Sequence, residues 1–237
     1  MPKKYSTPFS SPLYTSPPYH YVDAKIFIAL FYPSESSLKK LLPSPLRPSQ
    51  LPLATLLFGE QPCKEIGTFM ESGLLAQCMF DNKEKGEEEV GVFFSHNYVD
   101  TDKALASGRE IWGYPRKLAN IVMDWKGDTL TASTSRDGTT LLKATCTFDE
   151  EGEWIDSGPN VNIKMIPNIS GKGVDIAALT AAYTVYTVKN GRSGDVSIEI
   201  QSGPNDDFSM IEIESEMIGL YFDTDILVPP GNIITKL

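Results

Sequence analysis

The sequence predicts a mainly β protein whose strands form an antiparallel barrel or a pair of packed sheets. Short apolar or alternating runs recur along the chain, and turn-forming residues separate them. Strands do not alternate with long amphipathic helices, so a doubly wound parallel sheet is not expected. With 41% apolar residues among 237, the chain can bury a sizeable core. No repeat or linker divides it, and we expect a single domain over residues 1–237.

The first 22 residues are expected to form an extended arm. Prolines and serines alternate with tyrosines there, and proline lacks the amide hydrogen that a helix interior needs. The aromatic residues suggest that the arm lies on the body of the protein or on a neighbouring subunit. No apolar run follows the basic start, so we expect no signal peptide. A short helix is predicted over residues 34–42, capped by Ser34 and ended by Pro43.

Most of the remaining chain reads as strands separated by turns. The predicted strands are residues 26–31, 53–58, 73–80, 90–96, 121–125, 129–135, 139–148, 183–188, 195–200, 208–214 and 216–223. The clearest turn signals are at residues 126–128, 136–138, 190–191 and 202–205. Residues 223–237 are expected to be an irregular tail with one short closing strand.

Composition argues against several classes of partner. The net charge of −10 disfavours nucleic acid and anionic lipid, because proteins that bind these supply positive charge. No run of 18 apolar residues is present, so no membrane span is expected, and a cytoplasmic location is predicted. The acidic run at residues 84–89 is interpreted as a solvated hairpin loop.

Cysteine and histidine offer little material for a metal site or a histidine-based triad. The three cysteines are widely spaced and odd in number, which fits neither a disulfide framework nor a zinc spacing. Cys78 and Cys146 lie in apolar runs and are expected to be buried thiols. The two histidines, His20 and His96, are interpreted as structural. No metal or other cofactor is therefore expected.

The unusual stretch is residues 102–120, which begins with a short helical signal. Two adjacent cations, Arg116 and Lys117, follow a Gly-Tyr-Pro turn at residues 113–115. Both could be solvated loop charges. Alternatively, the turn could deliver one amine inward beside the second cation. Burial and the neighbouring charge would then lower the pKa of that amine, and the free amine could attack a carbonyl group.

This stretch resembles the lysine-pair segment of the acetoacetate decarboxylase family. Further matching segments fall in the same order at residues 6–8, 41–46, 69–73 and 159–168. The resemblance implies a closed antiparallel barrel-like core and a homo-oligomer. It also implies a lyase, of the decarboxylase or aldolase/dehydratase type, whose substrate is a small keto acid. In that chemistry a lysine forms an iminium with the ketone, and CO₂ leaves as the iminium takes up electrons.

The resemblance also names candidate site residues. Glu71 matches a family glutamate that could move a proton or hold the substrate, although a surface role before a turn is as plausible. Tyr98 lies on a segment that approaches the family's pocket, and Tyr114 belongs to the Gly-Tyr-Pro turn. Both are candidates for substrate binding, and Tyr98 could equally be a core or rim tyrosine.

The sequence departs from the family at the decisive position. Without gaps, the family's Schiff-base lysine falls on Arg116 and its cationic partner on Lys117. Arginine stays protonated and cannot form an iminium. Lys117 could replace it, but adjacent side chains of an extended segment point in opposite directions. Two further polar positions of the family fall on Ala24 and Leu56, which predicts a more apolar pocket.

Three hypotheses remain open. The first is a Schiff-base lyase of altered specificity that uses Lys117. The second is an enzyme without an iminium, in which Arg116 binds a carboxylate or enolate and Glu71 moves a proton. The third is a non-catalytic protein that binds a small acid. A purely structural or interaction role is the alternative outside ligand chemistry.

Overall fold

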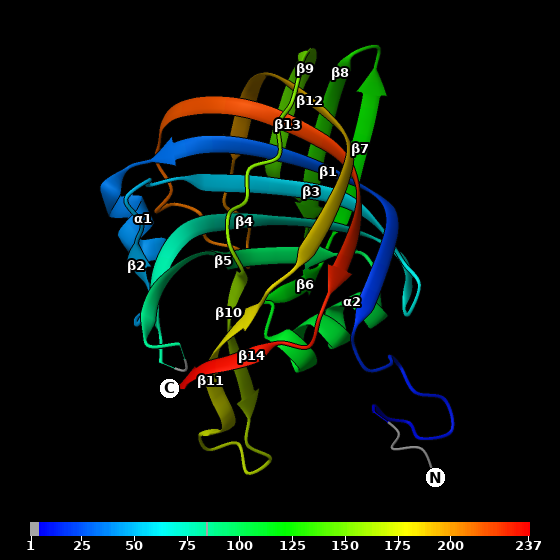
Figure 1. Ribbon diagram of the computed structural model, residues 1–237, viewed down its shortest axis with the longest axis vertical. Coiled ribbons are helices and arrows are strands. Elements are labelled where there is room, and N and C mark those ends of the chain that lie inside the picture. The colour runs from blue at the N-terminus through cyan, green and yellow to red at the C-terminus, as the bar shows by residue number, and fades with distance from the viewer. Residues whose placement is uncertain (1–4, 84) are drawn as a thin grey trace.

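The computed structural model describes residues 5–83 and 85–237, and strands dominate it, as predicted (Figure 1). The helical elements are α1 (Glu35–Leu41), α2 (Asp102–Ser107) and a π-helical turn, η1 (Gly108–Trp112). The strands are β1 (Tyr19–Pro33), β2 (Arg47–Pro48), β3 (Ala54–Cys63), β4 (Gly67–Asn82), β5 (Glu87–Val99), β6 (Arg116–Leu118), β7 (Asn120–Lys126), β8 (Thr129–Arg136), β9 (Thr139–Glu151), β10 (Asn160–Pro167), β11 (Val174–Ala182), β12 (Val185–Ile200), β13 (Ile213–Val228) and β14 (Asn232–Lys236).

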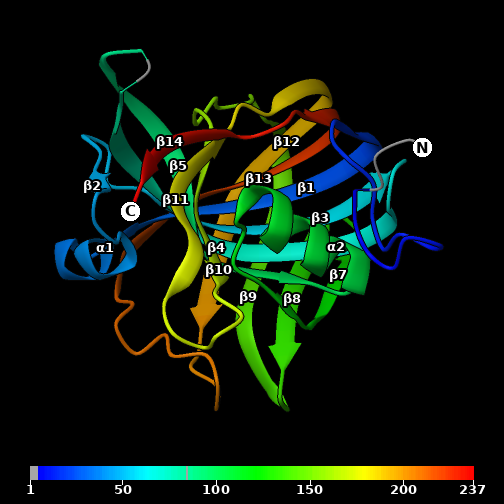
Figure 2. The same ribbon diagram turned by 90° about the horizontal axis from the view of Figure 1, so that it is seen from below.

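All strands belong to one strongly curved sheet. Its order is β14-β11-β10-β5-β4-β3-β1-β13-β12-β9-β8-β7, with β2 paired to β4 and β6 to β5. The expectation of a closed barrel needs correction. Closure requires the first and last strands of the order to pair with each other, whereas β14 pairs with β11 and β7 pairs with β8. The sheet is therefore open. In Figure 1, α2, β10, β11 and β14 lie below the long curved strands, and in Figure 2, which is seen from that side, α2 and β11 lie in front of β1 and β3.

The two faces of the central strands carry different cores, because successive side chains of a strand point to opposite sides. On one face, which we call the packed face, Phe27 lies against Phe58 of β3 and Phe148 of β9. On the opposite face, which we call the cavity face, Ile26 of β1 and Leu57 of β3 line open space. The packed face stabilises the fold, and the cavity face holds the site.

The N-terminal arm lies on the body over its described part. Tyr14 and Tyr19 are buried, and the Tyr14 hydroxyl donates a hydrogen bond to Glu110. Ser6 Oγ donates to the Tyr14 carbonyl oxygen at 2.7 Å. Strand β1 already begins at Tyr19, within the stretch of residues 1–22 expected to form the extended arm. Residues 1–4 lie outside the described residues.

Several predicted boundaries need correction. Asn190 and Gly191 do not form a turn. They lie within β12, where the register shifts between Val188 and Asn190, so the turn signal marks a bulge. Residues 208–212 form no strand; Phe208 instead packs in the core against His96. Strands β10 and β11 were not predicted. Residues 160–167 of β10 mix polar and apolar side chains, and β11 contains four alanines, which have weak β propensity.

The remaining local predictions agree with the described residues. Ser34 caps α1 by accepting a hydrogen bond from the backbone of Ser37. The acidic run forms the β4–β5 hairpin, with Lys85, Glu87 and Glu88 exposed; Glu84 lies outside the described residues. All three cysteines are buried free thiols. Among the described residues, no helix combines the length and apolar character needed to cross a bilayer.

Candidate active site

The pairing of β6 with β5 decides which of the two adjacent cations faces the cavity. The strands are parallel, with Asn97 beside Arg116 and Tyr98 beside Lys117. Because neighbouring side chains alternate, each pair shares one face of the sheet. Arg116 lies on the cavity face and is only 5% exposed. Lys117 lies on the packed face, at the edge of the sheet, with 40% of its side chain exposed.

A β-bulge at Ser95 sets this arrangement. Phe94 pairs with Leu75 and His96 with the adjacent Leu74, which leaves Ser95 as one extra residue in β5. Such an insertion reverses the alternation that follows it. Phe94 therefore faces the cavity, and so does Asn97. Regular alternation from Phe94 would instead turn Tyr98 towards the cavity.

Arg116 is held by three hydrogen bonds and two aromatic rings. Its Nε donates to Asn97 Oδ1 at 3.1 Å, Nη1 to the carbonyl oxygen of Ala104 at 2.7 Å, and Nη2 to Glu71 Oε1 at 2.7 Å. The guanidinium carbon lies 5.3 Å from the ring centre of Phe69 and 5.0 Å from that of Tyr114. These contacts fix the plane and position of the guanidinium.

Glycines in the preceding segment make room for this side chain. A Cβ atom on Gly108 would lie 2.5 Å from Cδ and 2.7 Å from Nε of Arg116, which no real packing allows. Gly113 ends η1 in the left-handed conformation, with a φ of 86°, where glycine is favoured. The chain then turns through Tyr114 into β6. Gly108 is thus a positioning residue for Arg116.

Glu71 of β4 completes the buried ion pair. Its Oε1 accepts hydrogen bonds from Arg116 and from Asn97 Nδ2, the latter at 3.2 Å. In the described part of the chain, Oε2 of Glu71 has no hydrogen-bond partner, although the residue is buried and lines the cavity. One carboxylate oxygen is therefore available to a ligand.

Electrostatics keep the guanidinium charged and the surrounding phenols neutral. Burial opposes the charge on Arg116, but the Glu71 carboxylate, together with Tyr21 and Tyr114, outweighs burial and raises the pKa of the guanidinium above its ordinary value. Burial raises the pKa of Tyr186 to about 12 and also raises the pKa of Tyr21 and of Tyr114. At neutral pH the cavity therefore offers one cation and several neutral hydroxyl donors.

The cavity itself has a volume of about 60 Å³. Besides the ion pair, its polar lining consists of Tyr21, Gln61, Tyr114, Asn160, Thr184 and Tyr186. Oε1 of Gln61 is buried with no partner in the described structure, so it is a second free acceptor. No lysine is among the described residues that line the cavity.

Most of these lining residues were not predicted from the sequence. Gln61 lies four residues after Leu57 on β3, so period-two alternation would have placed both side chains on the same face. Asn97, Asn160 and Tyr186 could not be placed in this way, since their place depends on strand pairing.

The predicted site residues therefore divide between two places. Arg116, Glu71 and Tyr114 meet at the cavity. Lys117 and Tyr98 meet instead at Asp206: Lys117 Nζ lies 2.6 Å and the Tyr98 hydroxyl 2.8 Å from Asp206 Oδ1.

Asp206 is saturated with donors. Its Oδ2 accepts from Arg136 Nη1 at 2.8 Å, so both carboxylate oxygens are paired. Leu56 points into the packed face, and neither it nor Ala24 lines the cavity. His96, also on the packed face, packs at 4.5 Å from the ring of Phe208. The cluster of Tyr98, Lys117 and Arg136 around Asp206 ties residues 202–208 to the sheet.

Comparison with known proteins identifies the family. The model of the family Acetoacetate decarboxylase (ADC) matches residues 6–237. The chain belongs to this family. Acetoacetate decarboxylase of Clostridium acetobutylicum is 26% identical over 98% of this chain and 95% of its own length. Acetoacetate decarboxylase 3 of Mesorhizobium japonicum is 24% identical over 99% of this chain and 91% of its own.

Solved structures of the acetoacetate decarboxylase family have the same fold. Acetoacetate decarboxylase of Legionella pneumophila superimposes with a TM-score of 0.84 at 26% identity, covering 98% of this chain and 94% of that one. The enduracididine biosynthesis enzyme MppR, solved with the condensation product of pyruvate and imidazole 4-carboxaldehyde, gives 0.86 at 16% identity, covering 99% and 97%. At that low identity the second likeness concerns the fold alone.

The buried cation of the cavity is an arginine, which cannot attack a carbonyl group. The adjacent Lys117 points away from the cavity and is paired with Asp206. The arrangement can bind an anion and accept a proton, and no lysine amine lines the cavity among the described residues.

Proposed function

We propose that this protein is a keto acid enzyme of the acetoacetate decarboxylase family that works through an enolate instead of an iminium. The observation that supports it is the buried Arg116–Glu71 pair, which leaves Glu71 Oε2 free in a cavity lined by no lysine among the described residues. A fixed guanidinium in a water-poor site stabilises negative charge that develops on oxygen.

Arg116 has capacity left for a ligand. A guanidinium carries five N–H groups, and three of those on Arg116 donate within the protein. One N–H on Nη1 and one on Nη2 remain for the ketone oxygen or the carboxylate of a keto acid. Neutral phenols of Tyr21 and Tyr186 on the cavity wall can donate to the other oxygens.

Glu71 supplies the proton acceptor. Its Oε2 takes a proton from the carbon beside the ketone, and the C–H electron pair forms the enolate double bond while the ketone oxygen becomes negative next to Arg116. In a decarboxylation, the C–C bond to the carboxylate breaks instead, and its electron pair forms the enolate of the product ketone as CO₂ leaves. A proton from water then adds at that carbon and gives the ketone.

The test is exchange of the α-hydrogens of 2-oxobutanoate in deuterium oxide, followed by proton NMR, with CO₂ release from acetoacetate as a second assay. We expect both activities to survive Lys117→Ala and to fall at least a hundredfold in Arg116→Ala. Borohydride with acetoacetate should leave no adduct. A reduced adduct on Lys117 by peptide mass would establish the iminium mechanism and overturn the enolate proposal.

The non-catalytic hypothesis gives a different result in the same experiments. Keto acids would then raise the melting temperature through Arg116 while neither exchange nor CO₂ release occurred. Homo-oligomeric assembly, a cytoplasmic location and a small keto acid as the ligand stay predictions.

A further inference from the structure

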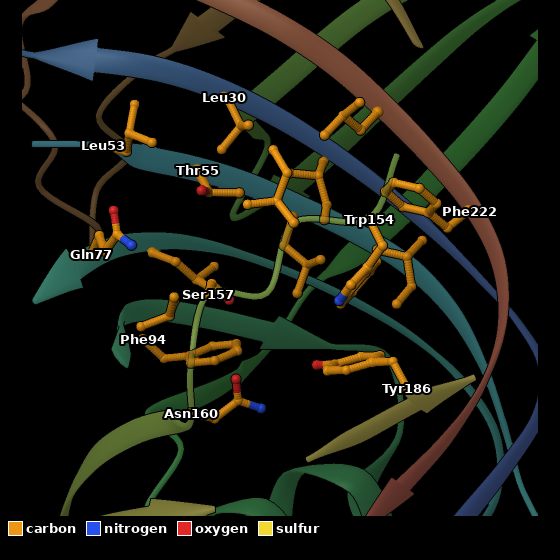
Figure 3. A pocket seen from close by; sticks show the side chains of 17 residues that line it. Leu30, Leu53, Thr55, Gln77, Phe94, Trp154, Ser157, Asn160, Tyr186 and Phe222 are labelled. Carbon is orange, nitrogen blue, oxygen red and sulfur yellow. The ribbon is translucent and has the colours of Figure 1, made fainter. Parts of the chain in front are cut away.

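A second, apolar chamber adjoins the Arg116 cavity. Its volume is about 110 Å³, and five residues line both spaces: Ile26, Leu57, Phe94, Asn160 and Tyr186. Phe94, Asn160 and Tyr186 lie along one side of the chamber in Figure 3. The shared residues place the two spaces side by side, the Arg116 cavity with the ion pair and the chamber with a mostly apolar lining.

The walls of the chamber are mostly hydrocarbon. Strands β1, β3, β4, β5 and β13 contribute aliphatic and aromatic side chains, among them Ile28, Leu30, Leu75, Leu220 and Phe222. The polar lining residues are neutral, namely Thr55, Gln77, Ser157, Asn160 and Tyr186, and none of the described lining residues is charged. A charged group would lose its hydration there without an oppositely charged partner, whereas an apolar group gains from leaving water.

The segment between β9 and β10, residues 152–159, closes the chamber on the side opposite the strands (Figure 3). The Trp154 ring centre lies 4.4 Å from that of Tyr186 and 5.1 Å from that of Phe222. Ile155 and Ser157 of the same segment also line the chamber. Aromatic contacts therefore hold this wall in place, and the space is not a gap between loosely packed strands.

We propose that this chamber binds the apolar tail of the substrate, so that the protein acts on a keto acid with an alkyl or aryl tail of several carbons. The inference rests on the proposed function, because Arg116 must hold the acid or ketone end. Apolar cavities of similar size, about 150 Å³, hold a benzene ring. Acetoacetate has no tail and would leave the chamber empty.

The experiment is a calorimetric titration with butanoate, hexanoate, octanoate and decanoate, which share one acid group and differ only in tail length. Burial of each methylene should tighten binding about fourfold until the chamber is full. Octanamide, which has the same tail without the charge, should bind at least tenfold more weakly than octanoate.

Two filling variants and one control locate the tail. Ser157 and Thr55 both line the chamber. Ser157→Phe and Thr55→Phe each put a ring into it and should remove the gain in affinity from butanoate to octanoate. Val122→Phe, an exposed position on β7 that lines neither space, should behave like wild type. Thermal melting confirms that each variant is folded, and the two filling positions lie on different segments.

The outcomes separate this inference from the proposed function. If affinity is the same for all four acids but butanoate binding depends on Arg116, the tail site is wrong and the acid site stands. If no acid depends on Arg116, the proposed function is wrong and the inference falls with it. Tail-dependent binding that survives both filling variants would also overturn the inference.

Discussion

Two buried carboxylates lie on opposite faces of the sheet beside β6, and they are used differently. Glu71 on the cavity face pairs with Arg116, and Asp206 on the packed face pairs with the next residue, Lys117. Both are carboxylates beside a cation, and sequence alone does not rank them. The difference is in the second oxygen. Asp206 Oδ2 is occupied by Arg136, whereas Glu71 Oε2 has no partner in the described part of the chain.

The comparison shows how a structural ion pair differs from a site. Donors to both oxygens of Asp206 satisfy its hydrogen-bonding capacity, and the result is a fixed contact that holds a loop. At Glu71 a free oxygen faces a cavity that also contains unused guanidinium N–H groups. A buried acceptor without a donor is unfavourable unless a ligand or water supplies one. The same residue types thus give a saturated ion pair on one face and a free acceptor beside a cavity on the other.

The largest effect should come from Glu71→Gln. The amide keeps the shape and can still accept from Arg116, but it cannot take a proton. We expect the α-hydrogen exchange rate to fall about 10²- to 10⁴-fold, the usual contribution of a general base. The free energy of unfolding, measured by urea denaturation, should also fall by about 3–5 kcal/mol, because the buried Arg116 loses its counter-charge, so the exchange rate is measured on the folded fraction. Unchanged exchange would remove Glu71 from the mechanism.

Asp206→Asn tests the other face. Both Lys117 and Arg136 lose a charged acceptor, and hydrogen bonds to charged groups are worth about 1.5–3 kcal/mol each at most. Because both cations are partly exposed, we expect the free energy of unfolding to fall by about 2–3 kcal/mol in total, with exchange activity preserved in the folded fraction. A loss of activity without loss of stability would contradict the division of the two faces.

Gly108→Ala should disturb the cavity face through packing. The added methyl group overlaps the Arg116 side chain, and overpacking of this kind costs about 1–3 kcal/mol. The displaced guanidinium should also weaken keto acid binding. The control is a double-mutant cycle with Arg116→Ala, where the stability loss should largely disappear because the overlapping atoms are gone. An additive cycle would contradict the positioning role.

The effect expected to be smallest at neutral pH is that of His96 on the packed face, which changes the stability of the protein only in acid. Burial, and then the nearby Lys117, lowers the pKa of His96 to about 4, whereas Asp206 and Asp207 oppose this shift. The unfolded chain therefore binds a proton near pH 6.5 that the folded protein does not bind until about pH 4.

The sign follows from this difference in protonation. Stability from this group is complete above pH 6.5 and falls as the pH drops towards 4, by up to about 1.4 kcal/mol per unit. In His96→Phe, the free energy of unfolding, measured with urea at each pH, should no longer change with pH over that interval. An unchanged slope of this free energy against pH would show that another group titrates.

Several features of the site could be predicted from the sequence. The segment with the Gly-Tyr-Pro turn and two cations was singled out from the sequence, and its Tyr114 and Arg116 line the candidate cavity together with Glu71. Strand patterns located most of the sheet because one-sided burial leaves a period of two. Strands β10 and β11 were not predicted from this pattern, since their side chains do not alternate cleanly. Asn160 of the candidate site, which lies in β10, was therefore not predicted either.

Residue types, their order and the family were therefore determined by the sequence itself, because chemistry such as an arginine in place of a lysine is a local property. The tertiary structure decided which of Arg116 and Lys117 enters the cavity. That choice depends on the register of β6 against β5 and on one extra residue at Ser95, which reverses the alternation before Asn97 and Tyr98. A one-residue shift exchanges the two faces of a strand, and such a shift is fixed only by the neighbouring strands.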